Sequence, residues 1–190
     1  MKMKNRAMTI MVLATVFVLA GTVQAAKVID EQFGPDGSTV ELVKAKVRNG
    51  VLTLAARYVH PWELTTPEER KKYNSFDSAN KMTQIRHRKI PIKFKVGSVF
   101  YVADGKKYHV LKDKAGNWLA SPVAGDYIAG PVDKDVLRKM KKKNQIPALV
   151  LTDDHPVQIL WFKFPAPPEG VTEIEFQIPE VSPFDVEIKQ

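Results

Sequence analysis

The sequence predicts a mainly β protein, an antiparallel β-sandwich with two short helices. After the first 25 residues, apolar and polar residues alternate with a period of two over most of the chain, as they do in strands with one buried face. Turn-forming pairs such as Asn49-Gly50 separate these segments by few residues, which suits antiparallel hairpins. Helical patterns are confined to two short segments, so a parallel α/β fold is disfavoured.

The clearest hairpin centres on Asn49-Gly50, between residues 39–48 and 51–60. Both turn positions tolerate positive φ, so the pair suits a two-residue type I′ turn. Such a turn sets the register and therefore decides which side chains share a face. The predicted pairs are Val47 with Leu52, Ala45 with Leu54 and Val43 with Ala56 on a buried face, and Lys46 with Thr53 and Leu42 with Arg57 on a solvated face.

A second hairpin is predicted around Asp104-Gly105, between residues 98–103 and 106–111. Its register places His109 opposite Phe100, so we interpret His109 as a cross-strand packing residue and not as a metal ligand. The buried face of this hairpin is expected to comprise Val99, Tyr101, Tyr108 and Val110.

Near the C-terminus, residues 157–164 and 171–178 have strand patterns and are joined by the proline-rich segment 165–170. The first strand is apolar on both faces, because it carries Ile159 and Trp161 in addition to its inward residues, and we expect it to be covered on both sides. The residues expected to face one another across the sheet are Leu160, Phe162 and Phe164 with Ile174, Phe176 and Ile178.

Two segments carry helical patterns. Residues 66–74 begin with Thr66-Pro67-Glu68-Glu69, which supplies an N-cap, a proline at the first helical position and a glutamate three residues after the cap. Residues 133–143 carry acids in the first turn and lysines in the last, which matches the helix dipole. The apolar side of the second helix comprises Val136, Leu137 and Met140.

The first 25 residues have the pattern of a secretory signal peptide. Basic residues precede an uncharged, largely apolar run at 7–22, and Val23-Gln24-Ala25 places small residues at the two positions that a signal peptidase reads. The alternative, a retained membrane anchor, needs about 20 apolar residues, and this run is shorter. We expect cleavage after Ala25, which leaves an N-terminal extension at 26–37, a β-sandwich domain at 38–190 and no membrane span.

Composition and motifs exclude several kinds of catalytic and metal site. The chain has no cysteine, which excludes disulfides, thiolate metal sites and thiol catalysis. It has no Gly-x-Ser-x-Gly elbow, no glycine-rich phosphate loop and no His-Glu-x-x-His. The best remaining metal candidate, Asp153-Asp154-His155, consists of residues that are ordinary in a solvated turn. We therefore assign no catalytic residue, metal or cofactor.

The end of the chain provides a resemblance. It reads Phe164-Pro165-Ala166-Pro167-Pro168, then a strand, then Pro183-Phe184-Asp185-Val186. This ending resembles the closing segment of bacterial exported immunoglobulin-like β-sandwich proteins, in which the Asn-Gly hairpin and the Tyr-x-x-Asp-Gly-Lys-Lys-Tyr segment, here at 101–108, also recur. The resemblance covers residues 38–188. It implies an immunoglobulin-like fold, an extracytoplasmic location and a role in binding or envelope assembly.

The net charge of +8 at pH 7 is unevenly distributed. Basic residues dominate 68–95 and 133–143, whereas acidic residues dominate 169–190. We expect the basic segments to converge into an anion-binding surface. Alternatively, they keep a β-rich protein soluble and protect its strand edges. The candidate binding residues are Arg70, Lys71, Lys72, Arg86, Arg88, Lys89, Lys139, Lys141 and Lys142.

The segment at 61–79 carries Trp62, Tyr73 and Phe76 among charged residues. Aromatic rings beside Arg or Lys can stack on a sugar or anchor a peptide, which makes Trp62 and Tyr73 further binding candidates. Alternatively, these rings fold back to cap the end of the sandwich.

Together these observations predict an exported, non-enzymatic binding or interaction module of the bacterial cell envelope, periplasmic or secreted. Its expected partner is an envelope protein or an anionic envelope polymer. Nucleic acid is not expected, although basic residues are present, because export separates the protein from it. The alternative function is an extracytoplasmic metal-binding protein or hydrolase whose site is assembled from distant loops.

Overall fold

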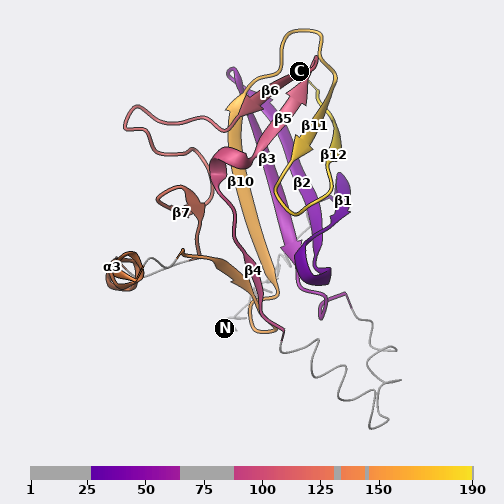
Figure 1. The fold of residues 1–190 in the computed structure, drawn as a ribbon. Coiled ribbons are helices and arrows are strands. Elements are labelled where there is room, and N and C mark those ends of the chain that lie inside the picture. The colour runs from indigo at the N-terminus through magenta and orange to yellow at the C-terminus, as the bar shows by residue number, and fades with distance from the viewer. Residues whose placement is uncertain (1–26, 65–87, 131–133, 144–145, 190) are drawn as a thin grey trace, which may run out of the picture.

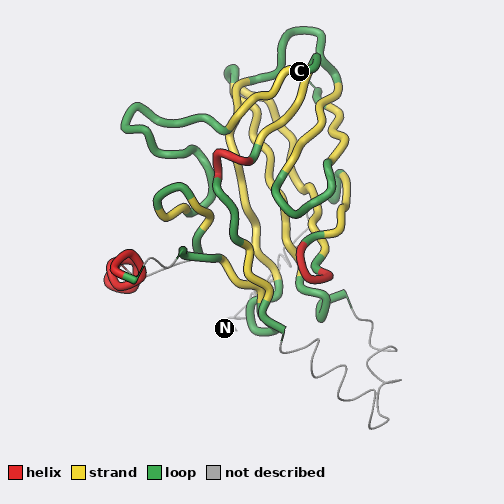
Figure 2. Tube along the Cα trace, in the orientation of Figure 1, coloured by secondary structure: helices red, strands yellow, loops and turns green. Residues whose placement is uncertain are grey.

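Two antiparallel four-stranded sheets face each other and enclose the core (Figure 1). This computed structural model describes residues 27–64, 88–130, 134–143 and 146–189. The predicted mainly β, antiparallel architecture is confirmed, and the sheets are arranged as a sandwich. Figure 2 shows that strands build both layers, whereas the few helical segments lie at their periphery.

The first sheet has the order β1 (Asp30–Phe33), β2 (Thr39–Arg48), β3 (Val51–Val59) and β10 (Val157–Pro165). The second sheet has the order β12 (Phe184–Glu187), β11 (Glu173–Gln177), β5 (Phe100–Ala103) and β6 (Lys106–His109). Two small ladders pair β4 (Ile90–Ile92) with β9 (Leu149–Leu151) and β7 (Val123–Ala124) with β8 (Tyr127–Ile128). The helical segments are η1 (Pro35–Gly37), η2 (Val96–Ser98) and α3 (Lys134–Lys142).

Aromatic rings join the two sheets. The ring centroid of Phe176 on β11 lies 6.1 Å from that of Phe162 and 5.9 Å from that of Phe164, both on β10. The ring centroid of Tyr101 on β5 lies 5.5 Å from that of Phe164. The hydroxyl of Tyr101 donates a hydrogen bond of 3.0 Å to the carbonyl of Pro165. All four rings are fully buried. Because burying one such side chain stabilises a fold by about 1.5–3 kcal/mol, this cluster is a major part of the core.

The sequence predicted that residues 157–164 and 171–178 face one another across one sheet. The sheet order shows that this prediction is wrong. β10 pairs with β3 in the first sheet, whereas β11 pairs with β5 and β12 in the second. Their apolar side chains therefore face one another across the core and not across one sheet. Prolines in the segment 165–170 cannot donate to a ladder, so the chain leaves one sheet there and enters the other.

The β2–β3 hairpin is confirmed near its turn. Asn49 has a φ of 51° and Gly50 a φ of 72°, as a type I′ turn requires. Val47 pairs with Leu52, and the next predicted pairs along the hairpin, Ala45 with Leu54 and Lys46 with Thr53, are also present.

Farther from the turn, the predicted register is wrong because of a β-bulge at Val43. Leu42, and not Val43, pairs with Ala56, and Arg57 pairs with Glu41. Leu42 is consequently fully buried, whereas Val43 is only half-buried. A bulge inserts one extra residue into one strand and shifts the alternation of faces, which a strict period of two does not anticipate.

The second predicted hairpin is confirmed. Asp104 and Gly105 have φ values of 47° and 71°. Phe100 pairs with His109, and their ring centroids are 5.9 Å apart. On the other face Val99, Tyr101 and Val110 are buried, and Tyr108 is half-buried and stacks on Tyr101.

The expectation that β10 is covered on both faces is wrong. Ile159 is 57% exposed, Val157 42% and Trp161 38%, and all three lie on the face turned away from the core. The second apolar face of β10 is therefore part of the protein surface.

The remaining expectations concern the helices and the N-terminal region. α3 confirms the helix predicted at 133–143, and its Met140 is half-buried. The helix predicted at 66–74 and the signal peptide at 1–25 lie outside the described residues. β1 pairs with β2, so the first sheet begins within the segment predicted as an extension at 26–37.

Candidate binding surface

The outer face of the first sheet carries a hollow of about 710 Å³. Its lining comes from three adjacent strands, β2, β3 and β10, and combines an indole, aliphatic side chains and two lysines. We call these residues the outer platform: Val43, Lys44, Thr53, Ala55, Ile159, Trp161 and Lys163.

Strand register arranges the platform in rows across the sheet. Adjacent strands lie about 4.8 Å apart, so residues on β2 and β10 in one row have backbones about 10 Å apart. The small side chain of Ala55 separates the two flanking residues of its row. One row consists of Lys44, Ala55 and Trp161. The next row consists of Thr53 and Lys163, and it continues on β2 to Lys46, which lies beside the platform.

The β-bulge shapes the platform. In a regular strand, successive side chains point to opposite faces, so Val43 and Lys44 would lie on different sides of the sheet. With the extra residue in β2, both side chains line the hollow. The residue that sequence periodicity assigned to the core is therefore part of the surface.

Positive charge surrounds the hollow. Lys44, Lys46 and Arg48 are exposed along β2. On β10, Lys163 is half-buried, with its Nζ 5.8 Å from the ring centroid of Trp161. The platform contains no acid, and Glu41, on the far side of the bulge, forms an ion pair with Arg57. The cations beside the hollow thus have no carboxylate among the platform residues to neutralise them.

The segment 111–121 holds the β10 side of the platform in place. The backbone N–H of Trp161 donates to Oγ of the buried Ser121 at 2.5 Å, and the N–H of Ser121 donates to the carbonyl of Trp161 at 2.7 Å. Lys163 donates to the carbonyl of Leu119 at 2.9 Å and accepts from the N–H of Leu111 at 2.8 Å. Because β3 pairs with the other edge of β10, the backbone beneath both side chains is fixed on two sides.

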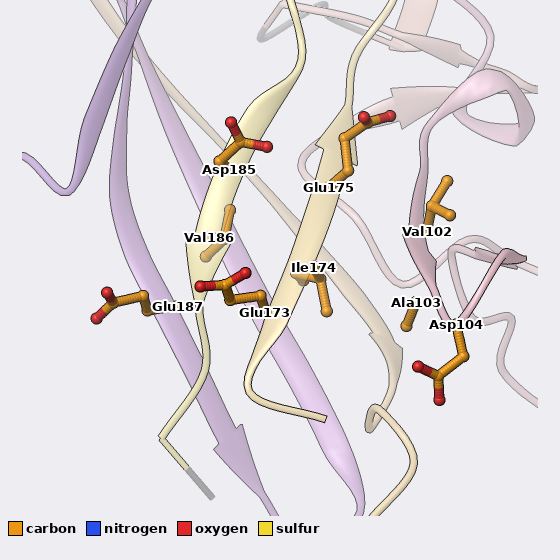
Figure 3. A pocket seen from close by; sticks show the side chains of 9 residues that line it. All are labelled: Val102, Ala103, Asp104, Glu173, Ile174, Glu175, Asp185, Val186 and Glu187. Atoms are coloured by element: carbon orange, nitrogen blue, oxygen red, sulfur yellow. The ribbon is translucent and has the colours of Figure 1, made fainter. Parts of the chain in front are cut away.

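The outer face of the second sheet carries a hollow that is lined by carboxylates (Figure 3). Its hollow of about 580 Å³, here called the acidic hollow, includes Val102, which is half-buried, and three other apolar residues that are buried. The carboxylates that line the acidic hollow are those of Asp104, Glu173, Glu175, Asp185 and Glu187.

Two of the predicted basic residues in α3, Lys139 and Lys142, form one exposed group with Arg138. Arg138, Lys139 and Lys142 are exposed and line a hollow of about 370 Å³ together with Asp135. Lys141 lies in the same helix. In Figure 1 this helix lies to the side of the sandwich, apart from β4, the strand that directly follows Arg88 and Lys89.

The other sequence candidates are distributed differently. Arg88 donates a hydrogen bond of 2.8 Å from Nη1 to the carbonyl of Asp36, and Lys89 is exposed. The remaining basic and aromatic candidates lie outside the described residues: Arg70, Lys71, Lys72, Tyr73 and Arg86.

Trp62 lies beside a buried histidine. The backbone N–H of Trp62, a half-buried residue, donates to Nδ1 of His60 at 3.1 Å. Nε2 of His60 therefore carries the proton and donates to the carbonyl of Arg88 at 2.8 Å. His60 is fully buried and ties together the two sides of the segment 61–88. Both ring nitrogens are occupied, so His60 is not placed to ligate a metal.

The metal candidate Asp153-Asp154-His155 lies in a turn. The backbone N–H of His155 donates to the carbonyl and to Oγ1 of Thr152 at 3.2 and 3.1 Å. Within the described ranges, no three histidine or acidic side chains come together as metal ligands. No helix in the described part of the chain is long and apolar enough to cross a membrane.

Two buried tyrosines have shifted pKa values. Burial raises the pKa of Tyr58, and the negative charge of Glu180 raises it further. Burial likewise raises the pKa of Tyr101, with a smaller contribution from Tyr108. Both phenols therefore remain neutral at physiological pH, and they are core groups with no part in the platform.

Fold and surface define the class: a β-sandwich with an apolar, basic platform on one outer face and an acidic hollow on the other. Comparison with protein-family models, curated proteins and solved structures finds no match for this chain. Sequence reasoning did not identify the platform. The signal that pointed to it was the second apolar face of β10, which we had expected to be covered.

Proposed function

We propose that this chain is an exported, non-enzymatic binding module of the bacterial cell envelope that presents a basic surface to an anionic partner. The outer platform carries this proposal, because Lys44 and Lys163 border an exposed apolar hollow that contains no acid. The platform also holds no carboxylate or imidazole to pair with these lysines in acid–base chemistry.

The separation of charge between the two outer faces supports an anionic partner. A surface of one sign raises the local concentration of oppositely charged molecules and speeds their association. Screening limits this attraction to about 8 Å at physiological salt, so the partner must contact the face directly. The hollow beside the lysines supplies an apolar contact that screening does not weaken.

The proposed location rests on the signal-peptide pattern at 1–25 and on the resemblance to exported immunoglobulin-like sandwich proteins. Outside the cytoplasm, the available anions are acidic envelope polymers and acidic proteins, and not nucleic acid. To test the location, the full chain is expressed in a bacterium and the osmotic-shock fraction is analysed by mass spectrometry. We expect a protein that begins at Ala26; a cytoplasmic protein that keeps residues 1–25 would contradict the proposal.

Binding is tested with immobilised polyglutamate, alginate and neutral dextran, at low salt and at about 0.5 M salt. We expect the protein to bind one or both polyanions but not dextran, and to lose affinity as salt rises. Binding that is insensitive to salt, or no binding to either polyanion, would contradict the proposal.

A matched pair of variants locates the surface. One carries Lys44→Gln in the platform with Lys46→Gln and Arg48→Gln beside it; the other carries Arg138→Gln, Lys139→Gln and Lys142→Gln in α3. Both lose the same formal charge, so a purely net-charge effect weakens binding equally. We expect the first variant to bind more weakly than the second. The reverse result would move the contact surface to α3.

A further inference from the structure

We infer that the outer platform binds an acidic polysaccharide, with Trp161 stacked on a sugar ring and Lys44 and Lys163 pairing with the acidic groups of the polymer. The inference rests on the proposed function and names the chemistry of its partner. It follows from three features of the platform: an exposed ring, flanking cations and a fixed backbone.

Trp161 provides the ring. Its side chain is 38% exposed on the outer face, in register with Ala55, whose small side chain leaves space beside the indole. Ile159, 57% exposed, extends the apolar surface along β10. An exposed flat ring in a shallow hollow suits the C–H face of a pyranose, which is apolar and of similar size, whereas the sugar hydroxyls remain in water.

The lysines provide the charge complementarity. Lys44 and Trp161 lie at opposite ends of one row, and Lys163 follows Trp161 in the next row of β10. A ring stacked on the indole therefore has a lysine on each of two strands that lie about 10 Å apart, and the two lysines are offset by one row along them. A polymer with one carboxylate on each successive sugar can engage both cations, whereas a neutral glycan leaves them unpaired.

The platform is also preorganised. Hydrogen bonds to Ser121 and Leu119 hold the backbone of Trp161 and Lys163 on one edge, and β3 holds the other. A site whose backbone is already fixed loses less conformational entropy on binding. This favours recognition of an extended polymer, which itself loses freedom when it binds.

The strongest competing occupant is the acidic hollow of a second copy of the chain. It matches the platform in charge, but of its apolar lining residues only Val102 is not buried, so it offers little to cover Trp161 and Ile159. An anionic bilayer is a flat surface and does not fill a hollow. An acidic polysaccharide can stack on Trp161, pair with the lysines and fill the hollow.

The test measures the binding of alginate and polygalacturonate, two polyuronates, against polyglutamate, which carries the same charge without sugar rings. We expect at least one polyuronate to bind about tenfold more tightly than polyglutamate, with a change in tryptophan fluorescence that Trp161→Ala removes. Trp161→Ala should weaken polyuronate binding about tenfold, the effect of losing a central aromatic contact, and leave polyglutamate binding unchanged. Trp161→Tyr, which keeps an aromatic ring, should retain most of the affinity for polyuronates. That result would show that a substitution at this position leaves the site folded.

Phe33→Ala is the matched aromatic control. Phe33 is 84% exposed on β1, at the opposite edge of the same sheet, so its loss should not change polyuronate binding. Equal affinity for polyglutamate and both polyuronates, with no effect of Trp161→Ala, would overturn the inference and leave the proposed function standing. Failure to bind any of these polyanions would overturn both. Tighter binding to anionic phospholipid vesicles, or loss of the platform to self-association in sedimentation experiments, would also overturn the inference.

Discussion

Glu173 on β11 lies directly opposite Glu187 on β12, and both carboxylates are exposed at the acidic hollow (Figure 3). The next pair on the same face of these two strands, Glu175 and Asp185, also brings two acids together. Like charges directly opposite each other on neighbouring strands are destabilising. The outer face of the second sheet therefore maintains its negative charge at some cost in stability.

Glu173→Gln should stabilise the protein. Removing one of two facing carboxylates relieves their repulsion, and we expect the free energy of unfolding to rise by about 0.2–1 kcal/mol at neutral pH and low salt. Urea denaturation measures the change, and high salt should reduce it because exposed charges are screened. Glu169→Gln, an exposed glutamate outside the strands, serves as the control and should change little. A destabilised Glu173→Gln variant would contradict the repulsion.

At the β-bulge, Leu42→Ala should destabilise the protein more than Val43→Ala. Simple alternation of faces, which places Val43 in the core, predicts the reverse. Leu42 is fully buried, so Leu42→Ala should cost about 2–5 kcal/mol of unfolding free energy, the range for buried leucines. Val43 is half-buried at the platform, and Val43→Ala should cost less than about 1 kcal/mol. Thermal or urea unfolding of the two variants measures both values. If Val43→Ala proved the more damaging, the bulge would be placed wrongly.

His60→Leu should destabilise the protein although leucine has a similar size. The substitution leaves the N–H of Trp62 and the carbonyl of Arg88 without their hydrogen bonds to the ring. A hydrogen bond contributes about 0.5–1.5 kcal/mol net, and urea denaturation can measure the loss of these two. His155→Gln is the control, since His155 is exposed, and should change stability by less than about 0.5 kcal/mol. Equal effects at the two positions would argue against this role of His60.

The turn at Asp113 should lose stability at acid pH. A hydrogen bond from the side chain of Asn117, together with bonds from the backbone of residues 115–117, holds the pKa of Asp113 below its ordinary value. The stabilisation is therefore fully present above the ordinary aspartate pKa and is lost as the pH falls through the lowered one. An NMR titration should show the carboxyl of Asp113 and the amides of 115–117 changing together. Asp113→Asn should remove that transition, whereas an unshifted titration of Asp113 would contradict the turn geometry.

Local chemistry made much of the fold predictable. Asn49-Gly50 and Asp104-Gly105 adopt positive φ with little strain, so both hairpins and their nearest pairs follow from the sequence. The acids and lysines of 133–143 likewise match the dipole of a helix. These predictions succeed because each depends on neighbouring residues alone.

The assignment of residues to faces was less predictable. Periodicity placed Val43 inside and treated the second apolar face of β10 as covered, and the structure reverses both. A bulge depends on pairing with another strand, and exposure depends on what the rest of the chain lays over a face. Neither is encoded in the spacing of apolar residues.

By itself, the sequence determined the class of the fold, its hairpin turns and the uneven distribution of charge along the chain. Tertiary structure decided that β10 joins β2 and β3 in one sheet while the acidic C-terminal strands β11 and β12 join β5 and β6 in the other, so that the basic platform and the acidic hollow lie on opposite outer faces. The physical reason is that turns are local, whereas sheet order is set by burying aromatic residues from distant segments in one core. Lys44, Trp161 and Lys163 become neighbours only as a consequence of that burial.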